Sequence, residues 1–590
     1  MNEQRRKMRI ISYWPECLVL LICAVLLLGY VDAKEGYHMD ELLSYELANA
    51  EFNPWIVPTQ PQGRLAKYVE NEIRGESLGE TANNLLETVR DVVQNRGSSK
   101  LLSYKADVYE EPVWIENKTF TDYITVGEED GFSYLSVYFN VKDDNHPPVH
   151  FMALHTVSSL FRGKATPIMG CVINLICVLG VMLLLIKLGR MFMTIRNLPE
   201  WGRFTGLLAA AVYGLSVGAV SSTLLIRMYA MVTFFCVALL YVHVRKLYSH
   251  ILGGNDFTNH NKLLILITVL GFWTQYFFLF YCLVLAAVTA VVLWSSKRRQ
   301  GLFCYVRAMV IAAVCGVVVY PFAIEDVFAS GRGVEALENL SSGIAGYGER
   351  IVAFGRIVFE QTGWILLALP VIVAVSVWMF IKTGNERSLN QKGVNCILWI
   401  PPIVYFLLAS RMSPYLVDRY IMPLFPFVVL AVCVALYRYV GEWSRREGKG
   451  FGAKVVAGVV ALLFVLGQLV TGYMHESNYL YKGYAGQKQI AADYAEYPCV
   501  CVYQGVGYYE NLQEFTRYDK TLLVTGDELA NRKETESLTD LESMVVLIKG
   551  GLDRAEITGI LEDKYGFYIS EVLMEEGAPY QDTLLLVKQK

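Results

Sequence analysis

Charged residues are scarce in this chain of 590 residues: only 18% are Asp, Glu, Lys or Arg, whereas 54% are apolar. Soluble domains carry about a quarter charged residues, and a soluble chain of this length would show charged surface throughout. Here the charges are confined to blocks between long apolar runs. The composition therefore predicts a polytopic membrane protein.

Signals of several common function classes are also missing. The net charge of −4 gives no basic field, so nothing indicates a nucleic-acid partner. There is no P-loop, and Gly505-Val506-Gly507 lacks the third glycine of a dinucleotide fingerprint. Ten of the 12 cysteines lie in apolar runs, and the spacing of Cys499 and Cys501 is a poor fit to a disulfide. No nucleotide site and no disulfide framework is predicted.

Apolar segments that could cross a bilayer recur along the chain. A helix needs about 20 mostly apolar residues to span the hydrocarbon core, and the fifth and sixth candidates are almost continuous. The eleven predicted spans are 13–32, 167–188, 204–225, 227–247, 262–279, 281–295, 304–322, 362–382, 395–410, 419–439 and 453–472.

Basic residues mark alternate connections between these spans, for example 187–203, 297–299 and 438–454. The positive-inside rule then places the N-terminus in the cytoplasm and the C-terminus outside. The first span, with its basic start and Ala33 after the apolar run, also resembles a signal peptide. We expect it to remain as an anchor, and its cleavage would not change the sidedness of the other spans.

Two large segments fall on the outer face, 33–166 and 473–590, with a smaller loop at 323–361. The expected domains are a transmembrane domain, 1–472, that includes the loops 33–166 and 323–361, and a C-terminal extracellular domain, 473–590. The latter is predicted to be a small α/β domain, because it combines one stretch of helical spacing, 553–564, with four short apolar runs: 499–503, 521–524, 544–548 and 583–587.

A polar cluster follows the first span. It contains His38, Asp40, Glu41, Ser44 and Tyr45. If a helix begins near Asp40, then Ser44 lies one turn after it, as Tyr45 does after Glu41. Adjacent carboxylates suit general-base chemistry, because one accepts a hydroxyl proton while the other positions it or binds a cation. The structural alternative is that Asp40 caps the helix and Glu41 interacts with its positive end.

A second cluster ends the same loop. Asp143, Asp144 and His146 precede Pro147-Pro148, and His150 begins an apolar run, 151–161, that is too short to span. The prolines suit the start of a helix. The acids and histidines could also bind a divalent metal, although they lack a specific ligand spacing.

Three arginines stand at outer ends of spans: Arg227, Arg332 and Arg419. An arginine there is costly unless it is solvated or paired with an anion, and its fork suits a phosphate. The alternative is an interfacial residue whose charged end reaches water. Three arginines on one side, with Tyr229 and Tyr420 beside two of them, favour an anionic lipid headgroup.

Together, these motifs resemble the type C glycosyltransferases, in particular the bacterial protein O-mannosyltransferases and the lipid A aminoarabinose transferase. The resemblance covers roughly residues 1–440, and the C-terminal domain resembles no family that we can name. One departure is Thr274-Gln275-Tyr276, where such proteins often carry Thr-His-Tyr. The matching residues are Asp40-Glu41 with Ser44, Tyr45 and Asn49, Asp144-x-His146-Pro147-Pro148, Arg227-Met228-Tyr229, Tyr320-Pro321, Phe328-x-Ser330-x-Arg332-Gly333 and Asp418-Arg419-Tyr420.

The resemblance implies a polyprenyl-phosphate-linked sugar donor and an acceptor hydroxyl on a protein, a lipid or a cell-wall glycan. It implies inverting transfer with Asp40 as base, Glu41 in support and Asp144 as the rival or second carboxylate. Donor phosphate would be bound by Arg227, Arg332, Arg419 and Tyr420. No nucleotide is needed, and a divalent metal is an open question. The competing hypotheses are a transporter or lipid flippase, and a receptor or envelope scaffold.

Overall fold

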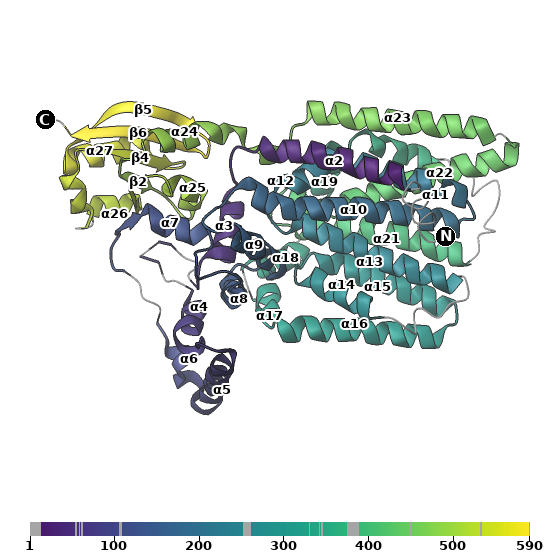
Figure 1. Ribbon diagram of the computed structural model, residues 1–590, viewed down its shortest axis with the longest axis horizontal. Helices are drawn as coiled ribbons and strands as arrows, with labels where there is room; N and C mark the ends of the chain where they lie inside the picture. Colours follow the sequence, from purple (N-terminus) through teal and green to yellow (C-terminus); the bar gives the residue numbers. More distant parts are fainter. Residues whose placement is uncertain are drawn as a thin grey trace, which may run out of the picture. The chain divides into compact units, whose positions relative to one another are not determined.

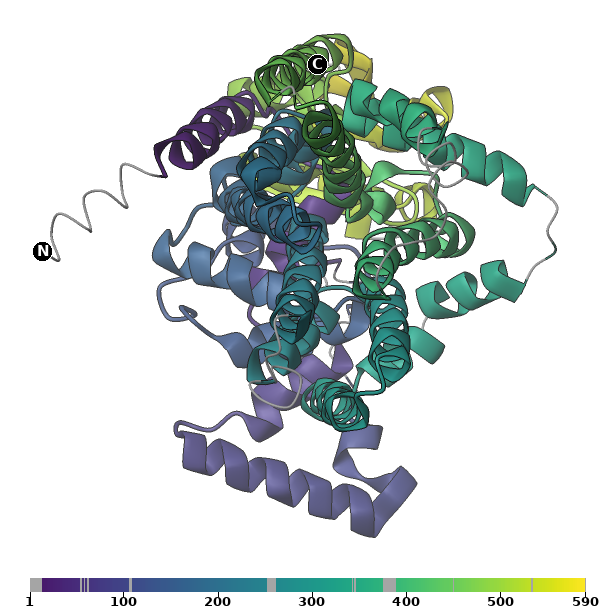
Figure 2. The ribbon, with the colours of Figure 1, turned by 90° about the vertical axis from the view of Figure 1, so that its right-hand side faces the viewer.

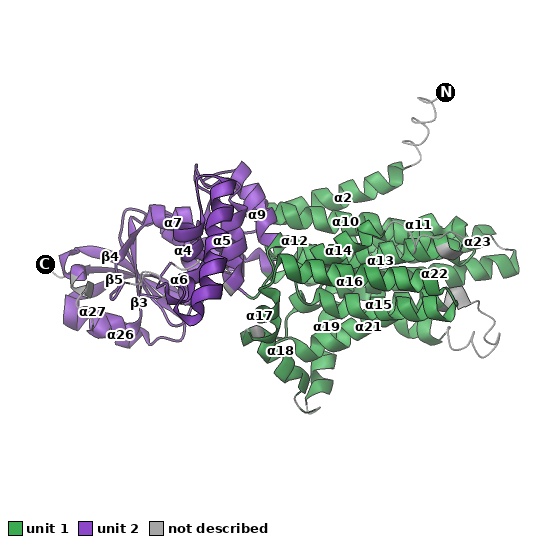
Figure 3. Cartoon of the chain, turned by 90° about the horizontal axis from the view of Figure 1, so that it is seen from below, with its two compact units in different colours: residues 1–32, 145–149, 171–478 green, residues 33–144, 150–170, 479–590 purple. Residues whose placement is uncertain are grey.

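The computed structural model describes residues 13–52, 56–57, 59–60, 63–105, 109–251, 261–329, 331–341, 343, 346–374, 389–448, 450–531 and 534–588. The chain divides into two compact units (Figure 3). Unit 1 comprises residues 1–32, 145–149 and 171–478. Unit 2 comprises residues 33–144, 150–170 and 479–590.

Unit 1 consists of helices that run alongside one another (Figure 1) and are seen end-on in Figure 2. Within the described residues, nine helices are long and apolar enough to cross a membrane, or ten if one bent pair counts as a span. The elements are α2 (Trp14–Asp32), α10 (Pro167–Ile195), α11 (Pro199–Gly214), α12 (Val217–Leu224), α13 (Tyr229–Ile251), α14 (Lys262–Phe272), α15 (Phe278–Ser295), α16 (Arg299–Val319), α17 (Ala323–Phe328), α18 (Gly331–Ser341), α19 (Tyr347–Thr362), η4 (Gly363–Leu367), α21 (Leu389–Met412), η5 (Asp418–Ile421), α22 (Leu424–Glu447) and α23 (Gly450–Met474).

Three of the predicted spans differ from the helices of the structure. The third is bent by 58° between α11 and α12, where the Ser216 hydroxyl caps α12 by accepting from the Ala219 amide at 3.2 Å. The fifth, α14, has 11 residues and is about 16 Å long, too short to span. The eighth begins at Tyr347 instead of 362, so the predicted outer loop 323–361 is in part helix.

Unit 2 contains a six-stranded sheet with the order β1-β3-β2-β4-β6-β5 (Figure 1). Strands β2, β3 and β4 are parallel, and the other pairings are antiparallel. The four predicted strands are confirmed. The strands are β1 (Trp114–Glu116), β2 (Cys499–Val502), β3 (Lys520–Val524), β4 (Ser543–Lys549), β5 (Phe567–Gly577) and β6 (Gln581–Lys588), and α24 (Ala485–Asp493), α25 (Leu512–Phe515), α26 (Gly526–Asn531) and α27 (Arg554–Tyr565) accompany them.

The edge strand β1 comes from the first loop, not from the C-terminal segment. Its residue Ile115 pairs with Thr521 of β3. The sequence assigns the loop 33–166 to the transmembrane domain, whereas in the structure most of this loop folds with residues 479–590 as one unit. A strand can join a sheet from any part of the chain. A strand of only three residues, such as β1, is too short to show a periodic pattern in the sequence.

The rest of the first loop is mainly helical. The predicted apolar helix at 151–161 is α9, which begins at Val149, directly after the two prolines. Its residues Phe151 and Leu154 are fully buried. The helices of the loop are α3 (Met39–Asn49), α4 (Arg64–Tyr68), η1 (Val69–Ile73), α5 (Leu78–Asn95), η2 (Arg96–Ser98), α6 (Lys100–Ser103), α7 (Asn117–Ile124), α8 (Tyr134–Asn140), η3 (Val141–Asp143) and α9 (Val149–Leu160).

Candidate functional site

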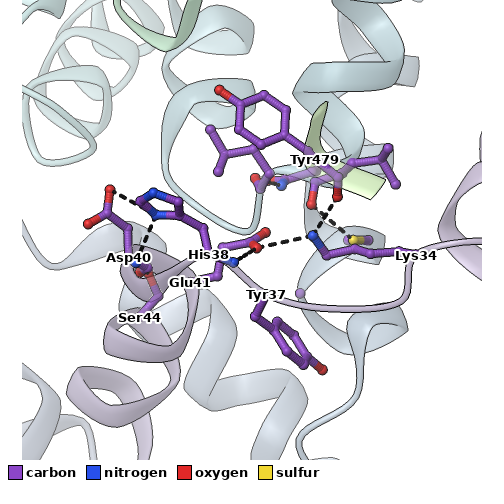
Figure 4. Close-up of polar contacts among 12 residues, drawn as sticks. Lys34, Tyr37, His38, Asp40, Glu41, Ser44 and Tyr479 are labelled. Carbon is purple, nitrogen blue, oxygen red and sulfur yellow. Dashed lines mark hydrogen bonds and ion pairs between the residues drawn. The ribbon is translucent and has the colours of Figure 1, made fainter. Parts of the chain in front are cut away.

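The first acidic cluster lies at the N-terminus of α3, and His38 is the residue that caps this helix (Figure 4). The His38 ring atom Nδ1 accepts from the Asp40 amide at 3.0 Å. Glu41 completes a capping box, because its Oε2 accepts from the His38 amide at 2.7 Å. The cap therefore uses His38 and Glu41, and Asp40 is not the capping residue that the structural alternative proposed.

The Asp40 side chain stands in the first turn of α3 and is 19% exposed. Its Oδ2 lies 3.5 Å from Nδ1 of His38. Ser44, one turn later, donates to the backbone carbonyl of Asp40 at 2.8 Å. A negative charge is favoured at the N-terminal end of a helix, which suits a carboxylate that acts as a general base.

Glu41 differs from its neighbour in being fully buried. Its Oε2 pairs with Nζ of Lys34 at 3.0 Å (Figure 4). Both side chains have no exposed surface. Lys34 also donates to the carbonyl of Tyr479 at 2.8 Å. The sequence predicts Glu41 as a supporting catalytic group. In the structure its carboxylate is held by this pair and by the cap of α3.

Tyr45 and Asn49 hold α3 within unit 2. The Tyr45 hydroxyl donates to the Thr166 carbonyl at 2.8 Å and accepts from the Gly170 amide at 3.1 Å. The Asn49 amide donates to the Ile124 carbonyl at 2.8 Å. Both side chains are buried, and these contacts fix the position of α3 within unit 2.

Glu46 is a buried acid on the same helix that the sequence reasoning missed. Its Oε1 accepts from the Tyr123 hydroxyl at 2.6 Å. Burial raises the pKa of Glu46 well above its usual value, and the nearby charge of Asp144 raises it further. The ion pair of Glu41 with Lys34 was also not predicted, because the two residues are seven positions apart across a non-helical stretch and no local spacing rule pairs them.

The second acidic cluster is divided between the two units, with Asp144 in unit 2 and His146 in unit 1. Asp144 follows η3 and is partly buried. The side chains of Asp143 and Arg332 lie outside the described residues. Among the described residues, no three His, Cys, Asp or Glu side chains are grouped so that they could hold a metal ion.

Arg227 lies between α12 and α13 and is 3% exposed. One terminal nitrogen of its guanidinium, Nη2, is 3.4 Å from Nδ1 of His146. The structure thus brings together two motifs that lie 81 residues apart in the sequence. The guanidinium fork of a buried arginine is a group that can bind an anion such as a phosphate.

The Tyr229 and Tyr420 rings join the two arginine motifs of unit 1. Their centroids are 6.3 Å apart in an edge-to-face arrangement, and both side chains are buried. The Arg419 guanidinium lies 5.6 Å from the centroid of the Tyr420 ring. Arg227-Met228-Tyr229 and Asp418-Arg419-Tyr420 therefore form one cationic and aromatic cluster, which can bind a phosphate through the arginine forks.

The connection between α14 and α15 contains Gln275, the residue at which the sequence departs from the expected Thr-His-Tyr motif. Its Oε1 accepts from the Phe277 amide at 2.5 Å, which holds the turn. The neighbouring Tyr276 hydroxyl donates to Oδ2 of Asp326, in α17, at 2.5 Å. Gln275 is thus a local structural residue of this turn.

No protein-family model and no curated protein sequence matches the chain. Among solved structures, ArnT from Cupriavidus metallidurans bound to undecaprenyl phosphate is similar, with a TM-score of 0.50 and 13% identity over 97% of this chain and 98% of that one. The apo ArnT of the same organism gives a TM-score of 0.43 and 15% identity, over 78% and 94% of the two chains. An Archaeoglobus fulgidus oligosaccharyltransferase tethered to an acceptor peptide gives 0.40 and 11%, over 95% and 69%.

The first of these similarities extends over almost the whole of both chains. It agrees with the fold class that the sequence motifs imply. The protein is a multi-pass membrane protein with the type C glycosyltransferase fold.

Proposed function

We propose that this protein is a membrane glycosyltransferase that transfers a sugar from a polyprenyl-phosphate donor to an acceptor hydroxyl on a protein, a lipid or a cell-wall glycan. The main support is the fold shared with ArnT, whose structure contains undecaprenyl phosphate. A lipid-phosphate sugar already carries its leaving group, so that no nucleotide is required.

In the proposed reaction, Asp40 accepts the proton of the acceptor hydroxyl as the hydroxyl oxygen bonds to the anomeric carbon. The bond between that carbon and the phosphate oxygen breaks, and the polyprenyl phosphate leaves with the electron pair. Direct displacement inverts the anomeric configuration. The partial exposure of Asp40 and its place at the N-terminus of α3 support this role. Asp144 is the second candidate.

The cluster of Arg227, Arg419 and Tyr420 is proposed to bind the donor phosphate and to stabilise its charge as it leaves. Arg332 is proposed as a further contact. We also propose that the N-terminus is cytoplasmic and that the reaction takes place on the outer face. The support for this orientation is that the connections assigned to the inner face carry clusters of basic residues next to the span ends.

The function is tested by incubating the purified protein with a panel of polyprenyl-phosphate monosaccharides and acceptor fractions, and measuring consumption of each donor. One donor is expected to be consumed and to stabilise the protein against heat. If no lipid-linked sugar is consumed or stabilises the protein, the proposed function is wrong.

Replacing Asp40 tests the base. Asp40→Asn keeps the size of the side chain but cannot accept the proton, and we expect turnover to fall by about 10²-fold or more. Protein abundance and thermal stability should stay unchanged. The matched control is Asp91→Asn on the exposed helix α5, which should keep full activity. Full turnover by Asp40→Asn would exclude Asp40 as the base.

A further inference from the structure

A buried ion pair connects the chain that follows the first span to both α3 and the C-terminal segment. Nζ of Lys34 lies 3.0 Å from Oε2 of Glu41 and donates to the Tyr479 carbonyl at 2.8 Å (Figure 4). All three residues belong to unit 2. Because the pair has no exposed side-chain surface, water does not compete for these bonds and neither partner can move without leaving a buried charge.

The C-terminal segment 479–484 packs around this pair through its aromatic rings. The Lys34 ammonium lies 4.6 Å from the centroid of the Tyr481 ring, a favourable cation–π distance. The Glu35 amide donates to the Leu480 carbonyl at 2.9 Å. A Cβ on Gly36 would lie 2.5 Å from the Tyr484 side chain, so Tyr484 approaches the backbone at position 36 as closely as only glycine allows.

The same pair continues into the cap of α3. Oε2 of Glu41 accepts from the His38 amide at 2.7 Å, and Nδ1 of His38 accepts from the Asp40 amide at 3.0 Å. An unbroken series of hydrogen bonds therefore runs from the Tyr479 carbonyl, through Lys34, Glu41 and His38, to the backbone of Asp40. A charge-assisted network fixes the groups at its end more strongly than isolated bonds do.

We infer that Lys34 and Glu41 are positioning residues, through which the C-terminal segment 479–484 holds the first turn of α3 and hence the carboxylate of Asp40. The C-terminal region thereby contributes to the reaction, because its contacts with Lys34 help to orient the proposed base. The assignment of Asp40 as the base rests on the proposed function. The fixing of the α3 turn does not.

The test uses a variant in which no buried charge is left alone. In Lys34→Met/Glu41→Gln both charges are lost, while the glutamine oxygen can still accept the His38 amide as in a capping box. We expect the double variant to fold. We also expect the amides of 38–42 to exchange with deuterium about tenfold faster or more, because the turn opens more often.

Turnover by the same variant tests the positioning of the base. We expect kcat to fall about tenfold or more while the donor KM changes less than about twofold, the signature of a misplaced reacting group. Lys34→Arg keeps the charge and should retain most of the activity. Lys488→Met removes an exposed pair with Glu35 at 3.6 Å and is the matched control, expected to behave as the wild type.

Unchanged amide exchange at 38–42 in the double variant would overturn the inference. Faster exchange with an unchanged kcat per folded molecule would overturn the positioning of Asp40. If the wild type consumes no lipid-linked sugar, the proposed function fails, and the exchange rates still decide whether the pair holds the turn.

Discussion

At the scale of single residues, burial separates the roles of groups that look alike in the sequence. Asp40 and Glu41 are adjacent, yet one side chain is 19% exposed and the other is closed off in an ion pair. Arg227 is 3% exposed, which disagrees with the alternative of a residue that reaches out to interfacial water. Its burial favours an anionic partner over water.

Replacing Arg227 tests this role in binding the donor. Arg227→Ala should raise the KM for the lipid-phosphate donor about tenfold or more, because charge-assisted bonds to the phosphate are lost. The acceptor KM should change little. Arg227→Lys keeps a charge without the fork and should give an intermediate value.

Steady-state kinetics with each substrate varied in turn make this measurement. Arg162→Ala, an exposed arginine of unit 2, is the control and should leave both KM values unchanged. Equal changes in donor and acceptor KM would argue against a phosphate role for Arg227.

At the scale of elements, the local sequence pattern was enough to predict those helices and strands that are regular and buried. The strands β2, β3, β4 and β6 follow apolar runs, whereas β5 is largely exposed and irregular in its pairing with β6, so no buried face marked it. The end of α14 at Phe272 was missed because the apolar run continues through the turn that Gln275 holds.

The strand β1 allows a prediction about the joint folding of the loop and the C-terminal segment. Ile115→Pro removes a backbone donor and restricts the strand next to Thr521. We expect β1 to detach, which would make residues 109–116 more susceptible to limited proteolysis. Ile115→Val keeps a β-branched strand former and is the control. Equal protease resistance of the two variants would show that the protection of residues 109–116 does not depend on the pairing of β1 with β3.

At the scale of the whole molecule, the predicted sidedness can be tested by labelling. Leu78 in unit 2 and Phe451 at the start of α23 are 92% and 83% exposed. A cysteine at position 78 should react with a membrane-impermeant maleimide added to intact cells, and a cysteine at position 451 should react only after permeabilisation. The opposite pattern would invert the proposed topology.

The sequence by itself determined the membrane class, the approximate positions of most spans, the α/β character of the C-terminal segment and the residues in which chemistry could lie. These properties depend on composition and local periodicity, which can be read from neighbouring residues without knowledge of the fold. Tertiary structure alone decided that the first loop and the C-terminal segment form one unit, that Arg227 meets His146, and that Glu41 is buried against Lys34. Burial and long-range pairing depend on which distant segments pack together, and no local pattern contains that information.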